Sequence, residues 1–192
     1  MSRQLLVPLP MLLLPLILIA NDVIARDWQV DAAKSSLTFK GNYQNGAFEG
    51  KFGKYDATIA LDEADVSKDR FDVNVQVASL DTQSAERDDT LRTADFFDPA
   101  KFPQAHFVTQ SFGKGADGGL EAKGTLTIRD QTKPVTLKVH FAASGPAGSG
   151  DSATLDVDTT LNRVDFGLGT SKDWVDISKD VSVHGHLVLA GK

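Results

Sequence analysis

Apolar residues recur at every second position over most of this chain. In the segment Phe71–Val77 the odd positions are apolar, whereas Asp72, Asn74 and Gln76 occupy the even ones. Successive side chains of a β-strand point to opposite faces, so this period predicts strands with one apolar and one polar face. The same alternation is found in 126–128, 135–141, 155–161 and 181–189. The chain is therefore expected to be all-β, with about eight to ten mostly sequential, antiparallel strands.

Antiparallel sheets must protect their edges, and this requirement favours a closed or nearly closed up-and-down barrel over an open sandwich. The parity of the apolar positions changes within one long segment. Phe48 and Phe52 are even, whereas Tyr55 and Ile59 are odd. A one-residue slip turns the buried face outward, so we expect a bulge or kink near Gly53 that restores the inward face.

The segment Ser79–Pro103 interrupts the strands with the pattern of a short charged helix followed by a Phe96-Phe97 pair. Ser84 is expected to cap a helix at 85–93, and the segment as a whole is expected to form a lid on the barrel. Paired carboxylates here could serve as a general acid and base, but a water-facing segment gives little reason for their pKa values to separate. The favoured interpretation is that Arg87 and Arg92 pair with nearby carboxylates and hold the helix on the barrel rim.

Residues 1–25 have the pattern of a cleaved signal peptide. Arg3 precedes an apolar run from Leu5 to Ala20 that contains three prolines and is shorter than the ~20 residues of a membrane-spanning helix. Cleavage after Ala25 would leave a single domain, residues 26–192. Because the chain has no cysteine, stability must come from a packed core, and a soluble protein of the periplasm is expected. The formal net charge is −6 and no basic stripe is present, so nucleic-acid binding is not expected.

Several short motifs, in this order and spacing, resemble the YceI-like family of lipid- or polyisoprenoid-binding proteins of bacterial envelopes. The resemblance covers about 28–189, and the motifs are Trp28–Asp31, Ser36–Phe39, Phe48–Phe52, Ser79–Thr82, Glu86–Asp88, Asp95–Asp98, Gly124–Ile128, Lys133–Val135 and Arg163–Gly167. It implies a lipocalin-like antiparallel up-and-down β-barrel of about eight strands, with one short helix and a lid segment. It also implies that residues 26–192 form a lipid-binding domain whose apolar interior holds a long isoprenoid or fatty chain.

Strand parity and this resemblance together predict the residues that contact the ligand. The inward-facing candidates are Phe39, Phe52, Ile59, Phe71, Val73, Val75, Leu126, Ile128, Leu137, Val139 and Phe141, and the lid or mouth candidates are Phe96, Phe97 and Trp174. The expected function is to bind, sequester or carry a long-chain lipid such as a polyprenyl compound, a quinone or a fatty chain. No other cofactor is expected.

No catalytic or metal site is expected. The chain lacks cysteine and a Gly-x-Ser-x-Gly turn, so covalent hydrolysis has no obvious nucleophile. Thr109 and Ser111 share the apolar parity of their strand, but lone hydroxyls in strands are more often structural. His184 and His186 have a spacing that can hold a metal, yet they alternate with the apolar positions and are expected to point outward.

Other interpretations stay open. The chain could instead be a non-catalytic envelope stress factor or a protein-interaction module that partners a membrane redox protein. Transient contact with a membrane and formation of a homodimer are also left open, as is the identity of the lipid.

Overall fold

The computed structural model describes residues 26–61, 65–144 and 152–191. In this part of the chain, eleven strands form one antiparallel sheet in the order β1-β4-β5-β7-β8-β9-β10-β11-β2-β3-β6, and β1 also pairs with β11. The strands are β1 (Arg26–Val30), β2 (Ser36–Tyr43), β3 (Gly46–Phe52), β4 (Tyr55–Leu61), β5 (Arg70–Gln76), β6 (Leu80–Asp81), β7 (Gln104–Lys114), β8 (Leu120–Ile128), β9 (Gln131–Ser144), β10 (Ser152–Asn162) and β11 (Asp180–Gly191).

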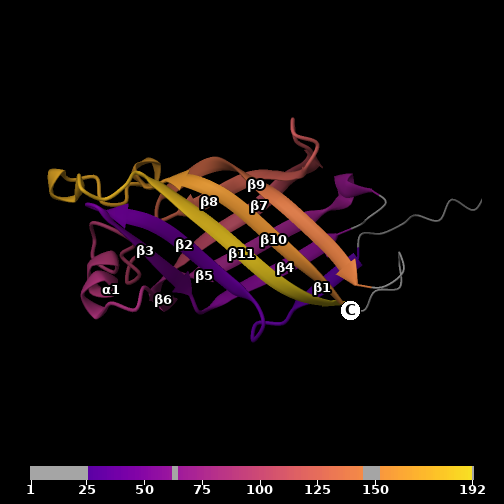
Figure 1. The fold of residues 1–192 in the computed structure, drawn as a ribbon, viewed down its shortest axis with the longest axis horizontal. Helices are drawn as coiled ribbons and strands as arrows, with labels where there is room; N and C mark the ends of the chain where they lie inside the picture. The colour runs from indigo at the N-terminus through magenta and orange to yellow at the C-terminus, as the bar shows by residue number, and fades with distance from the viewer. Residues whose placement is uncertain (1–25, 62–64, 145–151, 192) are drawn as a thin grey trace, which may run out of the picture.

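Six of these strands combine into three longer strands, each with one interruption. The pairs are β1 with β2, β3 with β4, and β5 with β6. Strands β1 and β2 follow one another along β11, with Trp28 opposite Gly191 and Thr38 opposite His184. Strand β4 pairs with β1 and β3 with β2, while β5 and β6 continue the series on β4 and β3. The result is a closed eight-stranded barrel in which each strand pairs with its neighbours in sequence (Figure 1). The predicted up-and-down barrel is confirmed.

The predicted kink near Gly53 is also confirmed. Strand β3 ends at Phe52 and β4 begins at Tyr55. Between them the backbone N–H of Gly53 donates to the carbonyl oxygen of Ser79 over 3.1 Å. The N–H of Lys54 donates to the Ser79 hydroxyl over 3.0 Å. The kink lets apolar residues of both parities face the interior.

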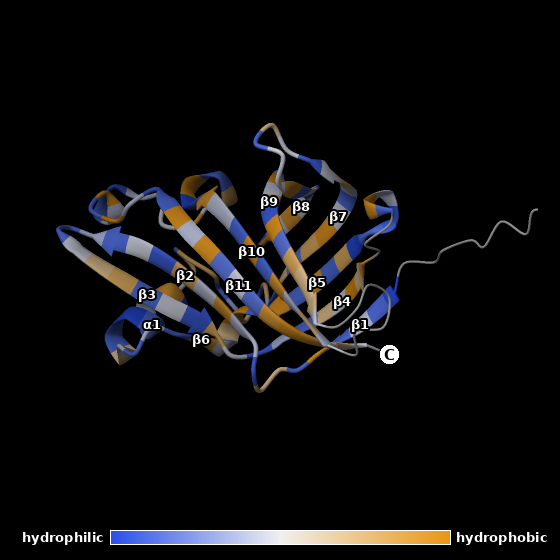
Figure 2. Ribbon diagram, turned by 45° about the vertical axis from the view of Figure 1, so that its right-hand side comes forward, coloured by the Kyte–Doolittle hydropathy of each residue, from blue (hydrophilic) through white to orange (hydrophobic). Residues whose placement is uncertain are grey.

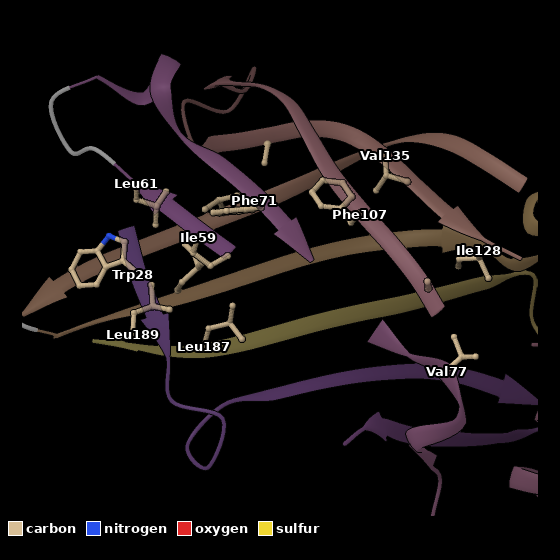
Figure 3. Packing of buried hydrophobic residues seen from close by; sticks show 14 of the residues in the cluster. Trp28, Ile59, Leu61, Phe71, Val77, Phe107, Ile128, Val135, Leu187 and Leu189 are labelled. Carbon is tan, nitrogen blue, oxygen red and sulfur yellow. The ribbon is translucent and has the colours of Figure 1, made fainter. Parts of the chain in front are cut away.

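Apolar and polar residues alternate along the strands, as Figure 2 shows. The inward residues near β1 form a closed core in which Trp28, Ile59 and Leu61 are at most 5% exposed. Figure 3 shows Trp28, Leu61 and Leu189 gathered near the end of β1, with Ile128 and Val77 well away from them along the barrel. Phe71 packs edge-on against Phe112 inside this core, with ring centroids 4.8 Å apart. One end of the barrel is therefore filled by side chains.

The helix and the segment between β10 and β11 lie at the opposite end of the barrel. Helix α1 (Ala85–Leu91) lies beside β3 and β6, and the segment between β10 and β11 extends past the same end (Figure 1). The described ranges also contain four short 3-10 turns, at Val66–Lys68, Val77–Ser79, Arg163–Phe166 and Lys172–Trp174. No helix in the described ranges is long and apolar enough to span a membrane. The predicted signal peptide, residues 1–25, lies outside the described residues.

The predicted helix after Ser84 is confirmed, with the Ser84 side chain accepting a hydrogen bond from the N–H of Arg87. It ends at Leu91, two residues before the expected boundary, because Arg92 is its C-cap. Phe97 then donates its N–H to the Leu91 carbonyl over 3.0 Å, which turns the chain back toward the barrel.

Candidate functional site: an apolar cavity at one end of the barrel

A cavity of about 550 Å³ opens at the end of the barrel that carries α1. Its wall consists of inward side chains from the strands, one face of α1, and residues of the lid and of the segment between β10 and β11. Most of these side chains are aliphatic or aromatic. The volume lies within the ~300–1,000 Å³ typical of small-molecule sites, and an eight-stranded barrel is wide enough to hold one such ligand. The shape and lining suit an apolar molecule.

Ten of the fourteen predicted contact residues lie on this wall. They are Phe39, Phe52, Val73, Val75, Phe96, Phe97, Leu126, Ile128, Leu137 and Trp174. Several of them, including Val73, Leu126 and Leu137, are only half-buried although they point inward. Their partial exposure arises because they face the cavity rather than another side chain.

The other four predicted contact residues do not line the cavity. Ile59, Phe71, Val139 and Phe141 point inward, but they belong to the closed core at the β1 end or pack against it. Phe141 meets the Trp28 ring edge-on with ring centroids 5.6 Å apart. Strand parity places these residues inside the barrel correctly. Parity alone could not predict that bulky side chains of β1, β4 and β11 fill this end of the barrel.

Aromatic rings make up much of the wall near the mouth. The ring centroids of Phe39 and Phe52 lie 5.2 Å apart, and Phe52 packs edge-on against Phe97 with ring centroids 5.9 Å apart. Phe96 meets Trp174 edge-on at 5.0 Å, and the Trp174 indole N–H donates to the Asp95 carboxylate over 2.9 Å. These contacts join the lid to β3 and to the segment between β10 and β11. The predicted lid residues thus form one apolar rim.

The wall residues that were absent from the sequence-based set include four apolar residues of the last two strands. Val157 and Leu161 of β10 and Val181 and Val183 of β11 line the cavity. All four have the inward parity of their strands, so the same alternation signal could have identified them. Ile177 lies in a loop, and no periodicity marks it.

Arg163 is the functional-site residue that sequence reasoning missed most clearly. Its side chain is buried, with 7% exposure, on the wall of an apolar cavity. All five of its N–H donors are used by backbone carbonyls: Nε binds Ser178, Nη1 binds Leu168 and Gly169, and Nη2 binds Trp174 and Ile177. Burial lowers the pKa of the guanidinium, but arginine stays charged at neutral pH. Arg163 therefore holds the segment between β10 and β11 against the cavity.

Of the two arginines expected to pair with nearby carboxylates, Arg92 pairs with Asp89, whereas Arg87 forms no ion pair within the described residues. Arg87 donates from Nη2 to the Thr82 carbonyl over 3.0 Å, and Arg92 donates from Nη2 to the Leu80 carbonyl over 2.8 Å. The ion pair between Arg92 and Asp89 spans 3.6 Å, and the Asp89 side chain is exposed. Carbonyls of the chain before the helix thus help to seat it on the rim.

Asp88 is the carboxylate that contributes most to this seat. It is buried and accepts hydrogen bonds from the Thr82 N–H over 2.9 Å and from the Thr82 hydroxyl over 2.6 Å. These bonds give Asp88 a structural role in holding the chain before α1 against the helix.

The histidines on β11 point away from the cavity, as predicted. His184 Nδ1 lies 2.9 Å from the Asp158 carboxylate, and His186 Nδ1 lies 2.6 Å from that of Asp156. Among the residues that the structure describes, no group of three or more side chains is arranged to hold a metal ion. Thr109 also has a structural role, because its hydroxyl accepts from the Phe71 N–H over 2.9 Å beside an irregularity in β7.

Comparison with known proteins agrees with this architecture. The model of the YceI-like domain matches residues 28–189. A "UPF0312 protein" of Vibrio cholerae is 36% identical over 149 residues, covering 75% of this chain and 78% of the relative. Protein YceI of Escherichia coli O157:H7 is 33% identical over 175 residues, covering 86% and 90%.

Solved structures show the same barrel. BcnA of Burkholderia cenocepacia superposes with a TM-score of 0.76 at 29% identity, covering 83% of this chain and 99% of that protein. A polyisoprenoid binding domain from Saccharophagus degradans has a TM-score of 0.62 at 15% identity, covering 88% and 99%, and this likeness concerns the fold alone. The family match spans nearly every strand described above and includes the lid and the Arg163 segment. The chain belongs to the YceI-like family.

Proposed function

We propose that this protein binds one long-chain, isoprenoid-like or fatty lipid in the cavity and sequesters or carries it. The observation that carries the proposal is the contrast between the two ends of the barrel. Side chains fill the β1 end, whereas the α1 end encloses an open apolar cavity. The name of the related polyisoprenoid binding domain supports the same class of ligand.

Apolar contact alone can supply the binding energy. Each buried methylene contributes roughly 0.8 kcal/mol, so about ten buried groups would contribute about 8 kcal/mol before the cost of association. The aromatic rim at Phe52, Phe97 and Trp174 would cover the chain near the mouth. Retention of lipid then depends on free volume inside the barrel, and this dependence can be tested.

The decisive experiment combines native mass spectrometry with organic extraction of the purified protein. Leu137→Trp should occupy the cavity and reduce the bound lipid at least tenfold, because Leu137 is on the wall. Thr136→Trp is the matched control, since this neighbouring side chain is exposed on the outer face. Its lipid content should equal that of the unmodified protein.

The expected result is a co-purifying lipid, or saturable binding of an added one, that Leu137→Trp abolishes without loss of the folded barrel. A protein that co-purifies with no lipid and takes up none when it is added would refute the proposal. Changing the surface charges of α1 could abolish biological activity while the lipid content stays the same. That result would favour a protein-interaction function instead.

The same proposal places the protein in the periplasm after cleavage of residues 1–25, where it acts without a catalytic step and without another cofactor. The Thr109 and Asp88 contacts support a binding role, since both groups already serve the fold. Cell fractionation and N-terminal sequencing of the mature protein test the location. Recovery of uncleaved protein in the cytoplasm would contradict it.

A further inference from the structure

One buried hydrogen-bond donor on the cavity wall has no acceptor. In the described part of the chain, four buried side-chain polar atoms lack a partner: Trp28 Nε1, the Tyr55 hydroxyl, Arg87 Nε and Arg129 Nε. Of these four residues, only Arg87 lines the cavity. A buried donor without an acceptor is destabilising and is rare in folded proteins, so a position on a ligand site calls for a specific reason.

The surroundings of Arg87 leave its charge available. One Nη2 hydrogen bond to the Thr82 carbonyl holds the guanidinium, which lies 5.1 Å from the centre of the Phe48 ring. Both Phe48 and Arg87 are on the cavity wall. None of the ion pairs found within the described ranges involves Arg87. The guanidinium is thus held in place at the mouth without being neutralised.

Arg163, the second arginine on the cavity wall, has no unbonded donor. Every N–H donor of Arg163 is bound to a backbone carbonyl. The other charged wall residues are Glu86 and Asp158, and both side chains are exposed. Asp158 already accepts the contact from His184. Among the described residues, Arg87 is therefore the charged residue of the wall that keeps unbonded guanidinium donors and has no ion-pair partner.

From this arrangement we propose that the preferred ligand is an amphiphile, in which a carboxylate or a phosphate monoester is attached to the apolar chain, and that Arg87 binds this anionic head at the cavity mouth. The proposal rests on the proposed function, because the chain must occupy the cavity for the head to reach Arg87. Oxygen acceptors of either head bind the accessible guanidinium donors of Arg87 and form charge-assisted hydrogen bonds. The chain supplies affinity and the head supplies selectivity.

A series of ligands with the same chain separates these two contributions. Hexadecane, 1-hexadecanol, hexadecanoic acid and hexadecyl phosphate are each used to displace a fluorescent apolar probe from the full-length mature protein. The acid and the phosphate should bind about ten- to a hundredfold more tightly than the alcohol. In Arg87→Met, which keeps an apolar stem, the preference for the anions should disappear while hexadecane binding stays the same.

Arg92→Met is the matched control. Arg92 lies on the same rim and makes one comparable bond to a backbone carbonyl, but it is not on the cavity wall. It should keep the full preference for the anions. Arg87→Lys preserves the charge without the Nε donor and should retain part of the preference.

The outcomes distinguish the two proposals. If the unmodified protein binds all four ligands with equal affinity, or if Arg87→Met and Arg92→Met lose the anion preference equally, the role of Arg87 is refuted while the lipid-binding function stands. If no ligand in the series binds, the proposed function itself fails. Should Arg87→Met not fold, the comparison of acid with alcohol in the unmodified protein decides whether an anionic head is preferred, and a full anion preference in Arg87→Lys would refute the role of the Arg87 guanidinium.

Discussion

Replacing Arg163 with methionine should be among the most destabilising single changes in this protein. The substitution keeps an apolar stem of similar length but removes all five donors, leaving the carbonyls of Ser178, Leu168, Gly169, Trp174 and Ile177 without partners. At roughly 1 kcal/mol net for each hydrogen bond, the loss would approach about 5 kcal/mol. Some carbonyls will reach water when the segment relaxes, so we expect a decrease of about 3–5 kcal/mol in the free energy of unfolding.

Urea unfolding followed by tryptophan fluorescence measures this change. Arg129→Met is the control, because Arg129 makes a single bond to a carbonyl of the same segment, from Nη1 to Gly167 over 3.1 Å. It should cost only about 1 kcal/mol. Arg163→Lys keeps the charge but lacks the planar fork, so it should rescue stability only in part. A loss below about 1 kcal/mol for Arg163→Met, or one equal to that of Arg129→Met, would refute the reasoning.

Further predictions concern the barrel, the seat of α1 and the response to acid. Gly124→Ala should destabilise the protein by about 1–3 kcal/mol, because its Cβ would clash with the backbone carbonyl oxygen of Val108 in β7. Gly113→Ala, with nothing within 4 Å of its Cβ, should be near neutral in thermal unfolding. Asp88→Ala should cost about 2 kcal/mol in the same assay, since two buried donors of Thr82 lose their acceptor, and no change would contradict this seat. A backbone N–H and then a lysine lower the pKa of Asp117. Its carboxylate therefore contributes stability above about pH 4 that is lost as the pH falls through the lowered pKa. In Asp117→Asn the free energy of unfolding should depend less on pH within that acidic range, as measured by urea unfolding at a series of pH values.

The barrel and its inward face could be predicted from the sequence because they depend on local geometry. The alternation in β5 assigns Phe71, Val73 and Val75 to one face, and the structure places all three inside. The parity change at Gly53 likewise predicted the kink between β3 and β4. A strand defines its two faces by itself, so these features need no knowledge of the neighbours.

The division between core and cavity could not be predicted in the same way. Phe71 packs in the closed core, while Val73 and Val75, on the same face of the same strand, line the cavity. The difference depends on which side chains of distant strands reach each position. The same holds for Arg163, whose five acceptors come from the turn that follows it and from a loop up to fifteen residues away.

The sequence by itself therefore determined the class of fold, the inward set of residues and the place of the lid helix, because period-two alternation and helix capping are properties of a few adjacent residues. Only the tertiary structure decided where the barrel is filled and where it is open, and which wall arginine has all of its donors bonded and which has not. Free volume and unsatisfied donors are left over when segments far apart in the chain have packed together. At Ser79–Pro103 the charged residues that could have been read as a catalytic cluster help to seat a helix, and one of them, Arg87, lines the cavity.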